Sequence, residues 1–159
     1  MGSESGDITM TQTTDSKLQT LDAQLCFALY STQLGLNKVY RGLLKDLNLT
    51  YPQYLVMLVL WEKDGVNVSE ICDRLFLETT TLTPLLKRLE ARGLIKRTRS
   101  IEDERQVIVT LTGEGQELKA TASHIPACVG EAMDCSLTEI ADLRDRLNEV
   151  RASLFKSAS

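Results

Sequence analysis

The stretch "NVSEICDRLFLETTTLTPLLKRLEARGLIKRTRSIEDERQVIVTLT", residues 67–112, contains two hydrophobic periodicities in succession. In its first part, "NVSEICDRLFL" and "ETTTLTPLLKRLEARGLI" place apolar residues at helical spacing, and each run begins with residues that favour a helix N-terminus. In its second part, "LIKRTRS" and "RQVIVTLT" alternate with period two on either side of "IEDE". The stretch therefore predicts two short helices followed by a β-hairpin with a charged tip.

Two short helices joined by a tight turn and followed by a hairpin are typical of a winged helix-turn-helix. Between residues 87 and 105 the chain has seven basic and four acidic residues, whereas its overall net charge is −4. The basic ones are Lys87, Arg88, Arg92, Lys96, Arg97, Arg99 and Arg105, and the acidic ones are Glu90, Glu102, Asp103 and Glu104. A local basic excess on an acidic protein indicates a surface for DNA, although a solvated helix face would give the same pattern.

The segments on either side of this unit also predict helices. Residues 17–46 have apolar positions at helical spacing over about eight turns, and a further helix follows Thr50. After the hairpin, two more helices are expected, opened by Thr112 and Ser136. The long terminal helices have apolar stripes that a lobe of this size cannot cover, so a second copy of the chain is the expected partner.

The expected fold is mainly α with a small β-hairpin wing: a winged helix-turn-helix domain with N- and C-terminal dimerisation helices. We expect a mobile tail at 1–16 and a single domain at 17–156. Within this domain the DNA-binding lobe spans about 50–112, and the dimerisation helices span about 17–46 and 113–156. Polar residues and few core formers distinguish the tail.

The composition argues against several other classes of protein. The strongly apolar run at 54–61 is too short to cross a membrane, and no export signal opens the chain. The four cysteines have no CxxC spacing and there is one histidine, so neither a metal site nor any other cofactor is expected. A reducing cytoplasm is the expected location, where a disulfide acts as a signal rather than as a structural link.

Cys26 lies within the amphipathic run "LDAQLCFALYSTQL", residues 21–34, and the ordinary interpretation of such a cysteine is an inert core residue. However, the chain resembles the MarR-family winged-helix repressors, and more narrowly the organic hydroperoxide resistance regulators (OhrR). The resemblance covers roughly residues 17–155. It rests on "QLCFALYS" (24–31), "VYRGLLKDLNLTYPQYLVMLVLWE" (39–62), "TTTLTPLLKRLEARGLIKR" (79–97) and "DERQVIVTLT" (103–112).

The resemblance implies a homodimeric repressor that leaves its pseudo-palindromic operator when organic hydroperoxide oxidises one cysteine in each subunit. The reactive cysteine and two tyrosines of that family correspond to Cys26, Tyr40 and Tyr51. In a two-cysteine subclass, a C-terminal cysteine of the partner subunit forms a disulfide with the oxidised residue. Cys128 is assigned that resolving role here, with Cys135 as the alternative.

The spacing of these residues fits a site built across a dimer interface. Cys26 and Tyr40 share a face of the predicted helix but lie about 21 Å apart along it, so a second subunit would have to bring Tyr40 to Cys26. Tyrosine hydroxyls would donate hydrogen bonds to the thiolate, which attacks the peroxide and becomes sulfenic acid and then a disulfide. Apolar neighbours of Cys26 would favour an apolar peroxide.

Two other functions remain open from the sequence. One is a MarR-type repressor released by a small phenolic ligand, with Cys26 incidental. The other is a thiol peroxidase, against which the wing and the basic patch argue. For operator binding we expect hydroxyl donors at the start of the recognition helix, cations along its exposed face, and wing residues near the minor groove or phosphates. These are Thr79, Thr80, Thr81 and Thr83; Lys87 and Arg88; and Arg97, Arg99, Asp103 and Arg105.

Overall fold

The computed structural model describes residues 17–159, so the predicted tail at 1–16 lies outside the described residues. The chain divides into two compact units, one ending at Val39 and one spanning Tyr40–Ser159, and each is described by itself. No helix over residues 17–159 is both long and apolar enough to span a membrane.

The first unit contains a short 3-10 helix, η1 (Leu21–Ala23), and most of α2 (Leu25–Leu44). The prediction of one uninterrupted helix over 17–46 is therefore wrong. Gln24 has an extended backbone, its N–H donates to the carbonyl of Leu21, and its side-chain amide donates to the carbonyl of Leu18. These local bonds end η1, and a new helix begins at Leu25.

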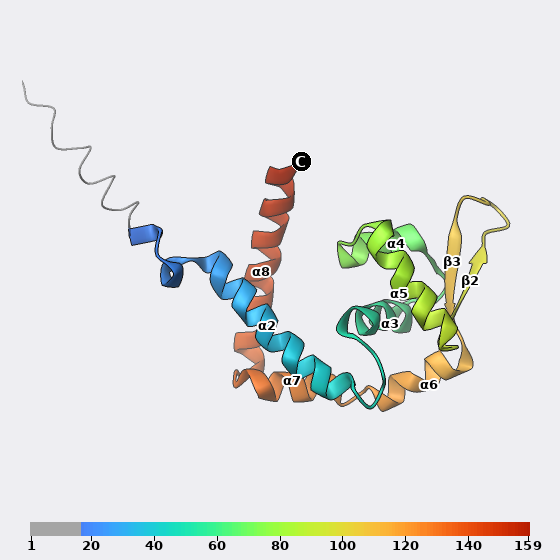
Figure 1. Cartoon of the computed structure of the whole chain (residues 1–159), viewed down its shortest axis with the longest axis horizontal. Coiled ribbons are helices and arrows are strands. Elements are labelled where there is room, and N and C mark those ends of the chain that lie inside the picture. Colours follow the sequence, from blue (N-terminus) through green and yellow to red (C-terminus); the bar gives the residue numbers. More distant parts are fainter. Residues whose placement is uncertain (1–16) are drawn as a thin grey trace, which may run out of the picture. The chain divides into compact units, whose positions relative to one another are not determined.

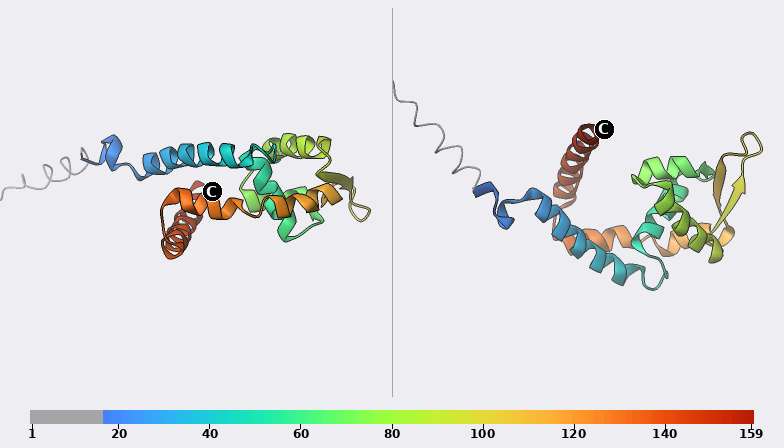
Figure 2. Two further views of the ribbon diagram at one scale, coloured as in Figure 1. Left: turned by 90° about the horizontal axis from the view of Figure 1, so that it is seen from below. Right: turned by 45° about the horizontal axis from the view of Figure 1, so that its top comes forward.

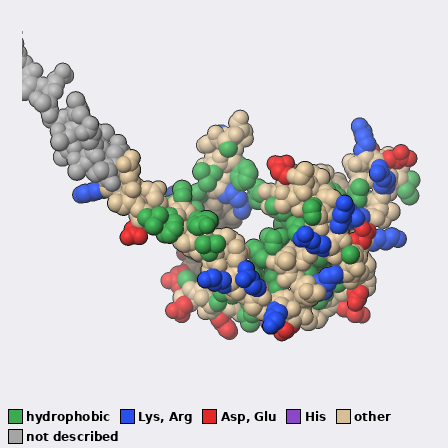
Figure 3. Space-filling model, in the orientation of Figure 1, with side chains coloured by type: hydrophobic (Ala, Val, Ile, Leu, Met, Phe, Trp, Pro, Cys, Tyr) green, Lys and Arg blue, Asp and Glu red, His purple; other side chains and the backbone are tan. Residues whose placement is uncertain are grey.

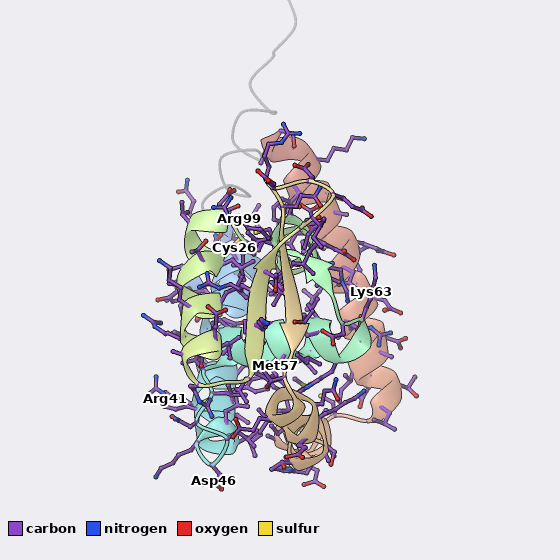
Figure 4. The ribbon with its side chains drawn as sticks, turned by 90° about the vertical axis from the view of Figure 1, so that its right-hand side faces the viewer. Cys26, Arg41, Asp46, Met57, Lys63 and Arg99 are labelled. Atoms are coloured by element: carbon purple, nitrogen blue, oxygen red, sulfur yellow. The ribbon has the colours of Figure 1, made fainter. Side chains whose placement is uncertain are left out.

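Helix α3 (Tyr51–Glu62) forms the centre of the second unit. Thr50 and Gln53 make a reciprocal capping box at its start, and Pro52 occupies the first turn, where its missing N–H costs no hydrogen bond. Half of its twelve residues are buried, including Met57, which lies among the packed helices in Figure 4. A helix with so little solvent-facing surface is suited to support the elements around it.

Helices α4 (Val68–Leu75) and α5 (Thr79–Ala91) form the helix-turn-helix predicted from the sequence. Asn67 caps α4 through a bond from the Glu70 N–H, and Phe76 ends α4 in the left-handed region with φ 56°. The apolar face of α5 is buried as expected, by Leu82, Leu85, Leu86 and Leu89. Figure 1 shows α4 and α5 packed together, with the hairpin next to them.

Strands β2 (Ile95–Arg99) and β3 (Val107–Leu111) form the predicted hairpin. A short strand, β1 (Val66–Asn67), which the sequence did not predict, pairs with the other side of β3, so the order is β1-β3-β2 and all pairs are antiparallel. Figure 2 shows the hairpin projecting beyond the helices of its unit, as a wing does. The expected fold class, mainly α with a small wing, is confirmed.

After the wing come α6 (Gly113–Thr121), α7 (Ile125–Met133) and α8 (Leu137–Ala158). The segment predicted as one helix after Thr112 is therefore two helices, interrupted at residues 122–124 just before Pro126. Helix α6 packs on the lobe, where the Trp61 indole N–H donates to the carbonyl of Gly115 at 2.9 Å. Helix α8 begins with the predicted capping box, Ser136 with Glu139, and none of its residues is buried within the single chain.

Candidate nucleic-acid interface and redox site

The N-terminus of α5 presents threonines to solvent. Thr79, Thr80 and Thr81 are exposed, and Thr83 is half-buried. The Thr83 hydroxyl donates to the carbonyl of Thr79 at 2.8 Å, and the Thr79 hydroxyl lies 3.8 Å from the Cys72 sulfur. Thr80 and Thr81 are therefore the threonines best placed to donate to a ligand at this end of the helix.

The far end of the wing exposes a paired arginine and aspartate. The Arg105 side chain is 91% exposed, and its Nε donates to Asp103 Oδ1 at 3.2 Å. The same oxygen accepts the backbone N–H of Arg105 at 3.1 Å, so Asp103 holds both the backbone and the side chain of Arg105. Arg99, labelled in Figure 4, donates from Nη1 to the carbonyl of Glu104 at 3.1 Å across the hairpin. The two hydrogen bonds to Asp103 hold Arg105 in a defined orientation at the wing tip.

Arg97 is placed differently from the other wing cations. Its guanidinium is hydrogen-bonded to Glu90 of α5, and its side chain is 25% exposed. The exposed cations near it are Lys87 and Arg88 on α5, and Lys96, Arg99 and Arg105 on the hairpin. Lys and Arg side chains gather over this part of the molecule in Figure 3. The phosphate contact expected of Arg97 stays a prediction.

A groove of about 830 Å³ next to the end of α5 adds cations that the sequence reasoning missed. Its lining includes Arg41 near the end of α2 and Lys45 just after it, and Arg88 of α5 and Arg92 at the C-terminal cap of α5, with no acidic side chain among the lining residues. Arg92 donates to the carbonyls of Leu47 and Asn48, which fixes one of these charges in place. The helical i, i+4 spacing of Arg41 and Lys45 was the available signal. They lie far in sequence from the other cations and were overlooked.

The two predicted tyrosines of the redox site meet in the structure. Tyr40 near the end of α2 and Tyr51 at the start of α3 stack with ring centroids 4.1 Å apart. Tyr54, which the sequence reasoning missed, is 3% exposed, and its ring centroid lies 6.0 Å from that of Tyr40. Its spacing of three from Tyr51 places both on one face of α3, and this was the signal that could have identified it.

The environment keeps these phenols protonated. Burial raises the pKa of Tyr40 to about 12, and the neighbouring Tyr51 and Tyr54 add to the effect. Burial also raises the pKa of Tyr51, while its hydrogen bond with Tyr40 partly lowers it, and burial raises the pKa of Tyr54. At neutral pH all three side chains are therefore hydrogen-bond donors rather than phenolates.

The four cysteines are free thiols in different environments. Cys26 is exposed at the second position of α2, in the first unit, and its neighbours Leu25 and Phe27 are also exposed. Cys72 is buried beneath the start of α5, as expected of a core residue. Cys128 is half-buried in α7, and Cys135 is exposed between α7 and α8 with its sulfur 3.3 Å from the carbonyl oxygen of Met133.

Over residues 17–159, no group of three or more His, Cys, Asp or Glu side chains is arranged to hold a metal ion.

Comparison with known proteins defines the class. The profile of the family described as transcriptional regulator SarA/Rot matches residues 38–122. The chain is 48% identical to the HTH-type transcriptional regulator TtmR of Methylorubrum extorquens over 94% of this chain and 76% of that protein. It is 49% identical to the organic hydroperoxide resistance transcriptional regulator of Bacillus subtilis over 69% of this chain and 74% of that protein.

Among solved structures, the fold resembles AbfR of Staphylococcus epidermidis. The TM-score is 0.77 with reduced AbfR bound to DNA, at 34% identity over 87% of this chain and 95% of that chain. The TM-score is 0.61 with disulfide-formed AbfR, at 34% identity over 94% of this chain and 97% of that chain. A structure of overoxidised AbfR bound to DNA is also similar to this chain. The chain belongs to the MarR-type winged-helix family, within the group that contains the organic hydroperoxide regulator. It is a DNA-binding transcriptional regulator and not an enzyme.

Proposed function

We propose that this protein is a redox-sensing repressor that binds operator DNA as a reduced homodimer and is released when organic hydroperoxide oxidises Cys26. The observation that carries the proposal is the stacked Tyr40–Tyr51 pair, two protonated phenols in a chain that also has an exposed thiol and a basic winged helix. The names of its relatives, an organic hydroperoxide regulator and AbfR in reduced and disulfide forms, support the same function.

Operator binding is assigned to α5 and the wing. Thr80 and Thr81 at the start of α5 would contact base edges and phosphates, and Arg105, held by Asp103, would enter the minor groove. One such unit reads only a half-site, so a pseudo-palindromic operator requires two copies. The exposed apolar side chains of α8, including Leu143 and Leu154, support a second copy as the partner.

The sensing reaction is a two-electron oxidation of two thiols. The Cys26 thiolate attacks the peroxide O–O bond, forms the S–O bond of a sulfenic acid, and releases the alcohol after the leaving alkoxide takes a proton. A second thiolate then attacks the sulfenic sulfur and forms the disulfide, and the displaced hydroxide takes a proton and leaves as water. Overall, the peroxide is reduced to alcohol and water. The exposed Leu25 and Phe27 beside Cys26 favour an organic peroxide over the more polar hydrogen peroxide.

The resolving thiol is assigned to Cys128 of the partner subunit, with Cys135 as the alternative. Both lie near the junction of α7 and α8, outside the DNA-binding surface, and Cys135 is the more exposed of the two. AbfR has been solved bound to DNA in an overoxidised state as well as in the reduced state. This supports the disulfide, rather than thiol oxidation as such, as the step that releases DNA here.

The test measures DNA release by fluorescence anisotropy, with a duplex selected by the reduced protein from a random-sequence library. Cumene hydroperoxide is expected to release the wild type and to leave Cys26→Ser bound, because serine cannot form a sulfenic acid. Cys72→Ala is the matched control, since this buried thiol takes no part, and it should respond as the wild type does. On a non-reducing gel, Cys128→Ala should lose the cross-linked dimer, and if Cys135→Ala loses it instead, the alternative assignment holds.

Release of Cys26→Ser by the peroxide would show that the sensing proposal is wrong. If a phenolic carboxylate such as salicylate released both the wild type and Cys26→Ser from the duplex, and peroxide released neither, the protein would be a ligand-gated repressor instead.

A further inference from the structure

One carboxylate links the recognition helix to the wing. Glu90, in the last turn of α5, accepts the backbone N–H of Arg97 on Oε1 at 2.9 Å. Its other oxygen, Oε2, accepts Arg97 Nε at 3.0 Å and Nη2 at 2.7 Å. Three hydrogen bonds therefore join the end of α5 to the middle of β2.

These bonds fix the strand as well as the side chain. β2 is an outer strand of the sheet, and Arg97 stands opposite Val109 of β3. Because Glu90 accepts a hydrogen bond from the Arg97 backbone N–H, α5 is attached to the edge of the wing at the middle residue of β2. The two residues that form the link lie on either side of a tight turn in which Gly93 has φ 75°. A charge-assisted, two-pronged pair of this kind is stronger and more directional than a single neutral hydrogen bond.

The pair also removes Arg97 from the charges available to DNA. The hydrogen bonds from Arg97, first from its backbone and then from its side chain, lower the pKa of Glu90, so the carboxylate is ionised at neutral pH. The two opposite charges cancel for a distant phosphate, whereas Lys96, Arg99 and Arg105 remain exposed on the same hairpin. The pair is therefore better suited to hold the wing than to attract the duplex.

We propose that Glu90 and Arg97 are positioning residues for operator binding: their link sets the wing relative to α5 so that both elements reach one half-site together. This inference rests on the proposed operator binding. The competing possibility is that Arg97 leaves Glu90 and contacts a phosphate. The two ideas predict opposite effects for Glu90→Gln, a substitution that keeps the shape of the side chain and removes its negative charge.

If Arg97 leaves Glu90 to contact a phosphate in the complex, Glu90→Gln removes the ion pair that must break first. Operator affinity then rises, whereas the salt slope, which already includes this contact in the wild type, changes little. If the pair positions the wing, Glu90→Gln lowers affinity for the selected duplex by about tenfold, with little change in the salt slope. The loss then occurs although the protein has become less acidic, a result that electrostatics alone does not produce.

The experiment measures binding of a fluorescein-labelled duplex, selected by the wild type, at increasing potassium chloride concentrations, with a random-sequence duplex as the comparison. Glu104→Gln is the matched control, because it removes the same charge from the exposed wing tip without breaking this link. We expect unchanged or tighter binding for the control, and a loss confined mainly to the selected duplex for Glu90→Gln. Adding Arg97→Gln to Glu90→Gln should cause no further loss, because either change alone breaks the link.

Arg97→Lys provides a second variant. Lysine keeps the positive charge for a phosphate but cannot reproduce the guanidinium fork, so the proposal expects weaker selective binding. Circular-dichroism melting curves identify the temperature range in which each variant is folded, and affinities are compared within it. Tighter binding by Glu90→Gln, or full affinity in Arg97→Lys, would overturn the positioning role and leave operator binding intact. Failure of the wild type to select any duplex would overturn both proposals.

Discussion

Three tyrosines, Tyr40, Tyr51 and Tyr54, come from the end of one helix and the start of the next and form one aromatic cluster. The resemblance to a known family supplied the first two. Tyr54 was not predicted as a site residue, because it lies among the buried core residues of α3. Burial raises the pKa of each phenol because the charged form loses water that the cluster does not replace. The three phenols therefore stay protonated and act as hydrogen-bond donors over the whole physiological pH range.

Tyr40 gives a prediction about stability at high pH. Its pKa is raised from 10.0 to about 12, so folding favours the protonated form. The stability contribution linked to this proton is complete below pH 10 and is lost as the pH rises through about 12. Chemical denaturation across this range should show that Tyr40→Phe reduces the loss of stability relative to wild type. Tyr30→Phe, at an exposed position, is the control, and a Tyr40→Phe profile with the wild-type slope would contradict the prediction.

At the scale of elements, the junction of the wing and α6 depends on close backbone packing. Gly115 lies in the first turn of α6, where a Cβ atom would come within 2.1 Å of the carbonyl oxygen of Leu94. The same glycine accepts the hydrogen bond from Trp61 of α3. The end of the wing, α6 and the central helix therefore meet at a residue that has no room for a side chain.

Gly115→Ala should consequently destabilise the lobe by about 1 to 3 kcal/mol or more, because the clash involves backbone that cannot easily move. Gly113→Ala is the matched control in the same turn, since nothing lies within 4 Å of its Cβ position. Urea unfolding followed by Trp61 fluorescence measures both. Equal stability of the two variants would show that the junction relaxes around the added methyl group.

At the scale of the whole molecule, α8 carries apolar side chains that its own chain leaves uncovered. Leu143 and Leu154 are 59% and 61% exposed, and Leu137 near the start of the helix is 86% exposed. Near the other end, Phe155 packs against Phe76 with ring centroids 5.2 Å apart, and the Arg151 guanidinium lies 4.3 Å from the centroid of the Phe76 ring. A helix this long with little intrachain burial is expected to pack against another copy.

Replacing both Leu143 and Leu154 by lysine should therefore convert the dimer into monomers and weaken operator binding strongly, because each half-site is then bound separately. Sedimentation velocity gives the oligomeric state, and anisotropy with the selected duplex gives the affinity. Asn148→Lys, on the opposite face of α8, should leave both unchanged. A dimer that survives the double substitution would place the interface elsewhere.

The order of helices, the hairpin and the buried face of α5 could be predicted from the sequence because each depends on local periodicity and capping. The break at Gln24 and the division between α6 and α7 could not, because local hydrogen bonds there compete with helix continuation. The predicted role of Arg97 in phosphate binding depended on its charge alone. The structure shows its guanidinium bound to Glu90, a partner seven residues away across a turn.

The winged helix-turn-helix and the basic segment at 87–105 followed from residue type and spacing along the chain, whereas the resemblance to a known family assigned Cys26, Tyr40 and Tyr51 to one site. Only the tertiary structure decided which charges face solvent, that a third tyrosine joins the cluster, and that Glu90 fixes the wing to α5. Such features depend on which side chains from different elements meet, and on the water they lose when they do. Spacing along one chain does not specify that.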